Sequence, residues 1–158
     1  MLGKPVLIVA LLALWSPGTA QDFEAGMRDA AALAAAGNPS GAAAAYRTLL
    51  ARVPGATAAR ARVLDALGAT EIALGDYASG RQHCDEAASL YGTLGDPKHR
   101  SASLNRAGSA RLYAGDYRGA AGAFEAAARL SEADGDAEAQ AEQVSNLGNV
   151  FYFLGRYS

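Results

Sequence analysis

The stretch LYAGDYRGAAGAFEAAARL, residues 112–130, contains a Gly-Asp-Tyr phrase that returns along the chain at a fixed interval. The same phrase stands in IALGDYASGRQHCDEAASL, residues 72–90, and a Gly-Arg-Tyr variant occupies residues 155–157. The glycines of the three phrases lie 40 residues apart, as do Gly68, Gly108 and Gly148. A fixed period of about 20–50 residues is the sequence mark of a stacked-repeat architecture. The sequence therefore predicts repeats of 40 residues.

Each repeat has the pattern of two helices joined by a tight turn. Apolar and small residues recur at spacings of three and four in residues 101–115 and again in 117–128, which is the period of one helix face. Glycine ends the first helix in a left-handed conformation, and the following aspartate caps the second helix. These signals predict an all-α protein with helices at 22–36, 39–52, 57–74, 77–93, 97–114, 117–133 and 137–154.

A second series of glycines lies inside the predicted first helices, at Gly68, Gly108 and Gly148. Glycine in a helix interior costs about 0.5–1 kcal/mol relative to alanine. Because the glycine recurs at one position of the repeat, we interpret it as a point of close approach between helices. Large side chains such as Phe124 and Phe151 would then fill the spaces beside each contact.

The quoted motifs resemble those of the tetratricopeptide repeat (TPR) family. LGATEIALGDY, AGSARLYAGDY and LGNVFYFLGRY are similar to its first-helix signature, and Ala120, Phe124 and Ala127 match its second helix. The 40-residue period resembles the longer repeats of kinesin light chains and spindle-orientation adaptors. The resemblance implies a right-handed superhelical stack of antiparallel helix pairs. It divides the chain into a degenerate N-terminal capping pair at 21–56, repeats at 57–96 and 97–136, and an incomplete repeat at 137–158.

The resemblance also implies a binding surface, because the first helices of such a stack line a concave face that takes protein or peptide partners. In the long-repeat relatives an asparagine at the place of Asn146 contacts bound peptide. Arg106 and Ala66 hold that place in the earlier units, so the asparagine series is incomplete. Projected onto this chain, the inward residues are Arg62, Asp65, Ala69, Ile72, Asn105, Arg106, Ser109, Leu112, Tyr113, Ser145, Asn146, Asn149, Tyr152 and Phe153.

The first twenty residues have the pattern of a secretory signal peptide. Lys4 is followed by an apolar run from Val6 to Trp15 and by small residues at Gly18 and Ala20, which predicts cleavage after Ala20. A membrane anchor is the alternative, but a helical span needs about 20 apolar residues, twice the length of this run. We therefore expect an exported protein, periplasmic or secreted, with no membrane span after cleavage.

The composition argues against several other classes of protein. The net charge of −2 provides no basic field for nucleic acid. The lone Cys84 cannot form an internal disulfide, and neighbouring His83 points about 100° away on a helix, so we interpret Cys84 as a core residue. Neither a cofactor nor a metal site is predicted. The acidic residues near the last junction are interpreted as helix caps and solvent-facing charge rather than a calcium loop: Glu132, Asp134, Asp136 and Glu138.

These observations favour a non-enzymatic binding scaffold and leave two alternatives open. One is the N-terminal repeat region of a larger exported enzyme, similar to bacterial 40-residue-repeat proteins that end in a caspase-like CHAT domain, with catalytic residues beyond Ser158. The other is a structural spacer. The last predicted helix has nothing after it to cover its apolar residues, which are Val144, Leu147, Phe151, Phe153 and Leu154. We therefore expect a bare apolar face there, a longer array in the intact protein, or self-association through that helix.

Overall fold

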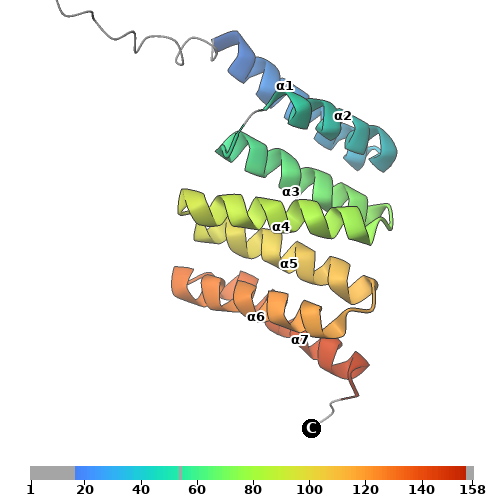
Figure 1. Ribbon diagram of the computed structural model, residues 1–158, viewed down its shortest axis with the longest axis vertical. Coiled ribbons are helices and arrows are strands. Elements are labelled where there is room, and N and C mark those ends of the chain that lie inside the picture. The colour runs from blue at the N-terminus through green and yellow to red at the C-terminus, as the bar shows by residue number, and fades with distance from the viewer. Residues whose placement is uncertain (1–16, 54, 156–158) are drawn as a thin grey trace, which may run out of the picture.

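The computed structural model describes residues 17–53 and 55–155, and within them every regular element is an α-helix. From residue 39 onward each helix begins and ends within one residue of its predicted bounds. None of the described helices is both long enough and apolar enough to cross a membrane. The helices are α1 (Pro17–Ala35), α2 (Pro39–Arg52), α3 (Ala58–Ala73), α4 (Tyr77–Leu94), α5 (Pro97–Tyr113), α6 (Tyr117–Asp134) and α7 (Ala137–Phe153) (Figure 1).

The N-terminal helix differs from its prediction. α1 begins at Pro17, five residues before the predicted start, and runs without a break through the predicted cleavage point after Ala20. Residues 1–16, which form most of the predicted signal peptide, lie outside the described residues. Export therefore stays a prediction.

The Gly-Asp steps form the turns between paired helices, as predicted. Gly75 has a φ of +82°, a conformation that only glycine adopts at little cost, and Asp76 Oδ1 accepts a hydrogen bond of 3.1 Å from the backbone N–H of Ser79. Forty residues later Gly115 has the same φ and Asp116 caps α6 in the same way. Local sequence thus sets both the end of each first helix and the start of the second.

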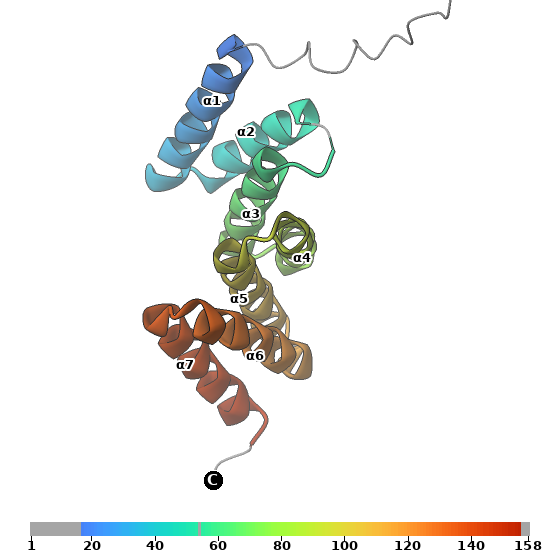
Figure 2. The ribbon, with the colours of Figure 1, turned by 90° about the vertical axis from the view of Figure 1, so that its left-hand side faces the viewer.

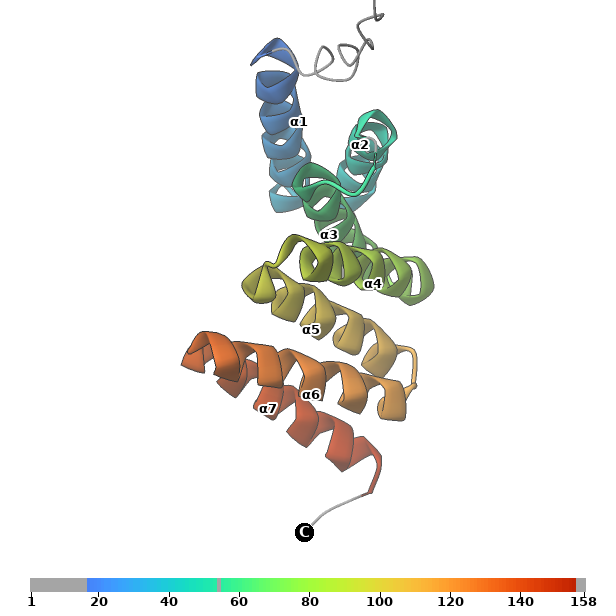
Figure 3. The ribbon, with the colours of Figure 1, turned by 60° about the vertical axis from the view of Figure 1, so that its left-hand side comes forward.

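The helices stack in chain order into an open array. Each helix contacts the next one, and in addition α3 contacts α5 and α5 contacts α7. The first helices α3, α5 and α7 therefore form one layer, and the second helices α4 and α6 lie beside them. Figures 2 and 3 show that successive helix pairs are rotated relative to one another along the elongated stack. This is the TPR-like solenoid that the repeat motifs predict.

The interior glycines mark close approaches between paired helices. A Cβ atom added to Gly68 would lie 2.6 Å from Cys84 Sγ, and one added to Gly108 would lie 2.8 Å from the ring of Phe124. Around Gly148 there is nothing within 4 Å. The packing interpretation is thus confirmed at the first two positions. Cys84 lies on α4 and Phe124 on α6, and no described residue lies at the equivalent place beside Gly148 in α7.

The core is divided among the interfaces rather than gathered at one centre. Phe23, Tyr46 and Leu67 belong to a cluster that joins the α1–α2 pair to α3. Phe124 and Val150 belong to another cluster, which joins α6 to α7. In repeat arrays each unit is stabilised mainly by its neighbours, so each of these clusters acts as a separate joint of the stack.

The outer face of α7 is bare, as the sequence predicted. Val144 is 56% exposed and Phe151 is 36% exposed. The residues 80 positions earlier in α3, Leu64 and Glu71, are 0% and 1% exposed. Side chains of α2 and α4 pack against Leu64 and bond to Glu71. Leu147 is half-buried against the cluster around Phe124 and Val150. Equivalent positions of α3 and α7 therefore differ in exposure because α3 is packed between described helices, whereas no described helix follows α7.

Candidate functional site

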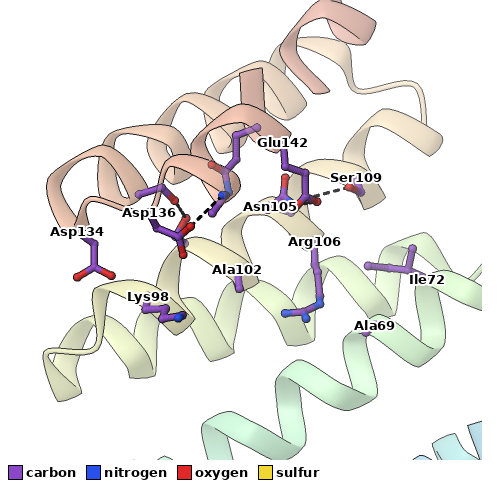
Figure 4. Close-up of a pocket in the computed structure, with 14 residues that line it drawn as sticks. Ala69, Ile72, Lys98, Ala102, Asn105, Arg106, Ser109, Asp134, Asp136 and Glu142 are labelled. Carbon is purple, nitrogen blue, oxygen red and sulfur yellow. Dashed lines mark hydrogen bonds between the residues drawn. The ribbon is translucent and has the colours of Figure 1, made fainter. Parts of the chain in front are cut away.

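The layer of first helices contains a cavity of about 350 Å³. It lies between α3, α5 and α7 and is closed at one side by the end of α6, so three successive helix pairs contribute to it (Figure 4). The lining residues are Ala69, Ile72, Lys98, Ser101, Ala102, Asn105, Arg106, Ser109, Ser131, Asp134, Asp136, Ala139, Glu142 and Gln143.

The cavity includes some of the residues predicted for the concave face. Ala69, Ile72, Asn105, Arg106 and Ser109 line it. The remaining predicted residues lie elsewhere on the first helices, outside the cavity wall, and no contact with a partner tests either group. They are Arg62, Asp65, Leu112, Tyr113, Ser145, Asn146, Asn149, Tyr152 and Phe153.

Several predicted binding residues bond to one another between adjacent repeats. Arg106 Nη1 donates to both carboxylate oxygens of Asp65 at 2.9 and 2.8 Å, and Ser103 Oγ donates to Asp65 Oδ1 at 2.7 Å. Asn146 Nδ2 donates to Asn105 Oδ1 at 3.0 Å. The Asp65–Arg106 and Asn105–Asn146 pairs both join residues 41 positions apart. These side chains form a polar ladder that links α3 to α5 and α5 to α7.

Arg62, the predicted binding residue nearest the N-terminus, also bonds to a residue of a neighbouring helix pair. Arg62 donates to the two carboxylate oxygens of Glu24 at 2.5 and 3.0 Å, and its guanidinium lies 5.6 Å from the ring centroid of Phe23. The hydrogen bonds from Arg62 hold the pKa of Glu24 below its ordinary value. Arg62 thus fastens α1 to α3 through two of its guanidinium nitrogens.

Other residues predicted to bind a partner are exposed and can still make contacts. Tyr113 is 62% exposed and packs at a tilt against Tyr77, with ring centroids 5.4 Å apart. Tyr117 and Phe153 repeat this pair one period later, stacked at 5.3 Å. Asn149 is exposed and forms no hydrogen bond with any of the described residues. These groups lie toward the C-terminal ends of α5 and α7 and are available for contact.

Most of the polar residues at the cavity were not predicted as binding residues. Glu142 stands 80 residues after Arg62, two full periods, so the repeat spacing could have identified it. Asp136 caps α7 by accepting a hydrogen bond of 3.0 Å from the Ala139 N–H, which confirms its predicted role. No sequence signal marked Lys98 or Gln143, because their place in the cavity depends on how α5, α6 and α7 come together.

Cys84 and His83 do not form a reactive pair. Cys84 is 0% exposed beneath Gly68, and this burial raises the pKa of its thiol to about 12. His83 Nδ1 instead lies 2.6 Å from Glu71 Oε2, and Arg47 Nη2 lies 2.7 Å from the other oxygen of Glu71. The prediction of Cys84 as a core residue is confirmed. Within residues 17–53 and 55–155, no three His, Cys, Asp or Glu side chains are grouped to hold a metal ion.

Comparison with known proteins identifies the fold. The sequence matches no protein-family model and no curated protein. The structure is similar to that of a putative kinesin light chain from Podospora anserina with nearly identical TPR-like repeats, with a TM-score of 0.74 and 12% sequence identity. The similarity covers 85% of this chain and 68% of that one. The chain therefore has the fold of a TPR-like repeat array, as its motifs predicted.

Proposed function

We propose that the chain is a non-enzymatic scaffold that binds a protein or peptide partner on the concave face formed by α3, α5 and α7. The observation that carries the proposal is the cavity of about 350 Å³ lined by the first helices of three successive pairs. TPR-like arrays are protein-interaction scaffolds, but a fold alone does not define a function. The cavity supplies the specific surface on which this function depends.

The polar ladder supports this proposal through preorganisation. Asp65, Arg106, Asn105 and Asn146 hold adjacent first helices in fixed register. A partner that binds such a surface does not have to order it first, which reduces the entropic cost of binding. Exposed Tyr113 adds a large contact area with few rotatable bonds, a property common among residues that dominate interfaces.

A peptide selection tests the proposed face. Peptides are selected from a random display library on the purified chain, and their affinities are measured by fluorescence anisotropy. Tyr113→Ala and Asn149→Ala should each weaken binding by about 5- to 30-fold, the range for residues at the centre of an interface. The matched controls Gln82→Ala and Arg129→Ala change exposed side chains on α4 and α6 and should have no effect.

The opposite pattern would refute the proposed face. If the α4 and α6 variants abolish binding and the Tyr113 and Asn149 variants do not, partners use the outer layer instead. If no peptide binds, the chain serves as a spacer rather than as a recognition module.

We further propose that the protein is exported, on the pattern of its first twenty residues. A fusion to alkaline phosphatase, which is active only outside the cytoplasm, should be active. N-terminal sequencing of the mature protein should begin at Gln21. An intact Met1 on protein recovered from the cytoplasm would contradict export. No described residue bears on the alternative of a larger exported enzyme, so that alternative remains a prediction.

The exposure of Val144 and Phe151 favours one more proposal, self-association through α7. Removing apolar surface from water favours association, but one helix face is small compared with a standard interface of about 800 Å² per partner. We therefore expect a weak dimer. Sedimentation velocity at increasing protein concentration should show dimers that Phe151→Ser abolishes. A monomer at every concentration would contradict this proposal.

A further inference from the structure

The ionisable groups around the cavity are not balanced. Lys98 and Arg106 are the cationic lining residues, whereas Asp134, Asp136 and Glu142 are anionic. The charge of Arg106 is already matched by Asp65, which lies outside the cavity wall, at 2.8 Å. One ammonium group therefore faces three carboxylates. The local field of the cavity favours a cation.

The carboxylates also keep free acceptor atoms. Asp136 uses Oδ1 to cap α7, and Glu142 uses Oε1 to accept a hydrogen bond of 2.7 Å from Asn105 Nδ2. Among the described residues, Asp136 Oδ2, Glu142 Oε2 and both oxygens of Asp134 have no hydrogen-bond partner. Figure 4 shows Asp134 and Lys98 at one side of the cavity and Glu142 nearer to Asn105. A ligand that offers several N–H groups would find acceptors on both sides.

A buried amide in the same wall points to a ligand independently of these charges. Gln143 is 2% exposed, and its Oε1 has no hydrogen-bond partner among the described residues. Leaving a buried polar group unpaired is unfavourable, so such groups are normally paired. The terminal torsion of a glutamine is broad, and the side chain lines the cavity, so its amide can turn toward a ligand there. A carboxamide offers an acceptor and donors together, which matches a peptide group.

We infer that the cavity between α3, α5 and α7, closed at one side by the end of α6, is a specificity pocket for a basic side chain of an extended peptide partner. Asp134 and Glu142 bind the cationic head, and the Gln143 amide pairs with the peptide backbone. An arginine suits the site better than a lysine because its five N–H donors reach several acceptors at once. This inference rests on the proposed function of the concave face and adds the chemistry of the ligand.

Lys98 has a distinct role in this arrangement. Its side chain is exposed and forms no ion pair with the described residues. It is the cation that an incoming basic side chain would meet, and it repels that side chain. Neutralising Lys98 should therefore strengthen binding, an effect that a merely structural lysine would not produce.

The test uses three pentapeptides that differ only at the central position, acetyl-Gly-Ser-Xaa-Ser-Gly-amide with arginine, citrulline or glutamate. Citrulline has the shape of arginine without its charge. Binding to the purified chain is followed by the shifts of assigned backbone amides in ¹H–¹⁵N NMR spectra at low salt. The arginine peptide should bind at least about 5-fold more tightly than the citrulline peptide, with shifts at Ala102, Asn105 and Glu142, since each exposed charge pair contributes modestly.

The variants separate the charge of the cavity from that of the surface. Glu142→Gln and Asp134→Asn should each weaken binding of the arginine peptide by about 2- to 5-fold, and Lys98→Gln should strengthen it by a similar factor. Glu138→Gln is the matched control, because it makes the same change on an exposed residue of α7 outside the cavity. It should leave the affinity unchanged.

Gln143→Met tests the buried amide separately. An apolar side chain of the same shape should leave the thermal midpoint unchanged or raise it, because an unpaired polar group is removed. It should weaken all three peptides by about 5-fold, which corresponds to one lost hydrogen bond. A raised midpoint with unchanged affinities would overturn the role assigned to Gln143.

The inference and the proposed function can fail separately. Equal affinity for the three peptides, a preference for glutamate, or no saturable binding of any of them would overturn the basic-side-chain pocket. The concave face as a binding surface would still be judged by the library selection. If the selected peptides bind there but carry no basic residue, the scaffold stands and the pocket assignment is wrong.

Discussion

The same substitution at equivalent positions of two repeats should have opposite effects on stability. In Gly68→Ala the new methyl group would lie 2.6 Å from Cys84 Sγ and 2.9 Å from the carbonyl oxygen of Gly80. The backbone of α4 cannot move aside as a flexible side chain can, so the helices must separate. In Gly148→Ala the methyl group would meet nothing within 4 Å.

The magnitudes follow from two opposing terms. Alanine is about 0.5–1 kcal/mol more favourable than glycine within a helix, and this gain applies at both positions. Overpacking a close contact costs about 1–3 kcal/mol and applies at Gly68 alone. Gly148→Ala should therefore stabilise the protein by about 0.5–1 kcal/mol. Gly68→Ala should destabilise it by up to about 2.5 kcal/mol, so the two variants should differ in sign.

Urea unfolding followed by circular dichroism measures both variants, with the free energy taken by linear extrapolation. Because each repeat contacts mainly its neighbours, amide hydrogen exchange in α3 and α7 should be recorded as well. Gly122→Ala is the control, since its Cβ would also meet nothing within 4 Å, and it should resemble Gly148→Ala. If Gly148→Ala destabilises the dilute protein as strongly as Gly68→Ala does, close packing does not explain the effect at Gly68.

Three further predictions concern buried groups. The thiol of Cys84 should resist disulfide reagents at pH 8 in the folded protein. Because its pKa rises from 9.0 to about 12 on folding, its contribution to stability should be complete below pH 9 and be lost between pH 9 and 12. Urea midpoints measured across that pH range test this loss. Arg47→Ala should destabilise by about 1–3 kcal/mol, although Arg47 is half exposed, because it leaves the buried Glu71 carboxylate short of a partner. Glu71→Leu should be close to neutral and should abolish the cost of Arg47→Ala in a double-mutant cycle. Phe124→Ala should cost about 3–5 kcal/mol in a urea titration, and a loss below 1 kcal/mol would mean that Phe124 does not anchor α6 on α5.

Local sequence signals are sufficient to define the helices of this fold. Gly75 and Asp76, repeated at Gly115 and Asp116, end one helix and begin the next through local backbone conformation and capping. Such signals act over three or four residues and need no tertiary contact, which is why the helix bounds were predicted to within one residue from position 39 onward. The position of Gly68 in the repeat also predicted a close approach, because glycine in a helix needs a packing reason.

Contacts between repeats, by contrast, decide which of the residues predicted for the concave face are free. Asp65 and Arg106 have the sequence character of binding residues, yet they bond to each other because the angle between α3 and α5 brings them together. Gln143 has no sequence signal at all, and its buried amide becomes a candidate ligand group only where α3, α5, α6 and α7 together line the cavity. Which side chains bond between repeats depends on how one helix pair is rotated against the next. That rotation results from the packing of many side chains and cannot be obtained from a motif of a few residues.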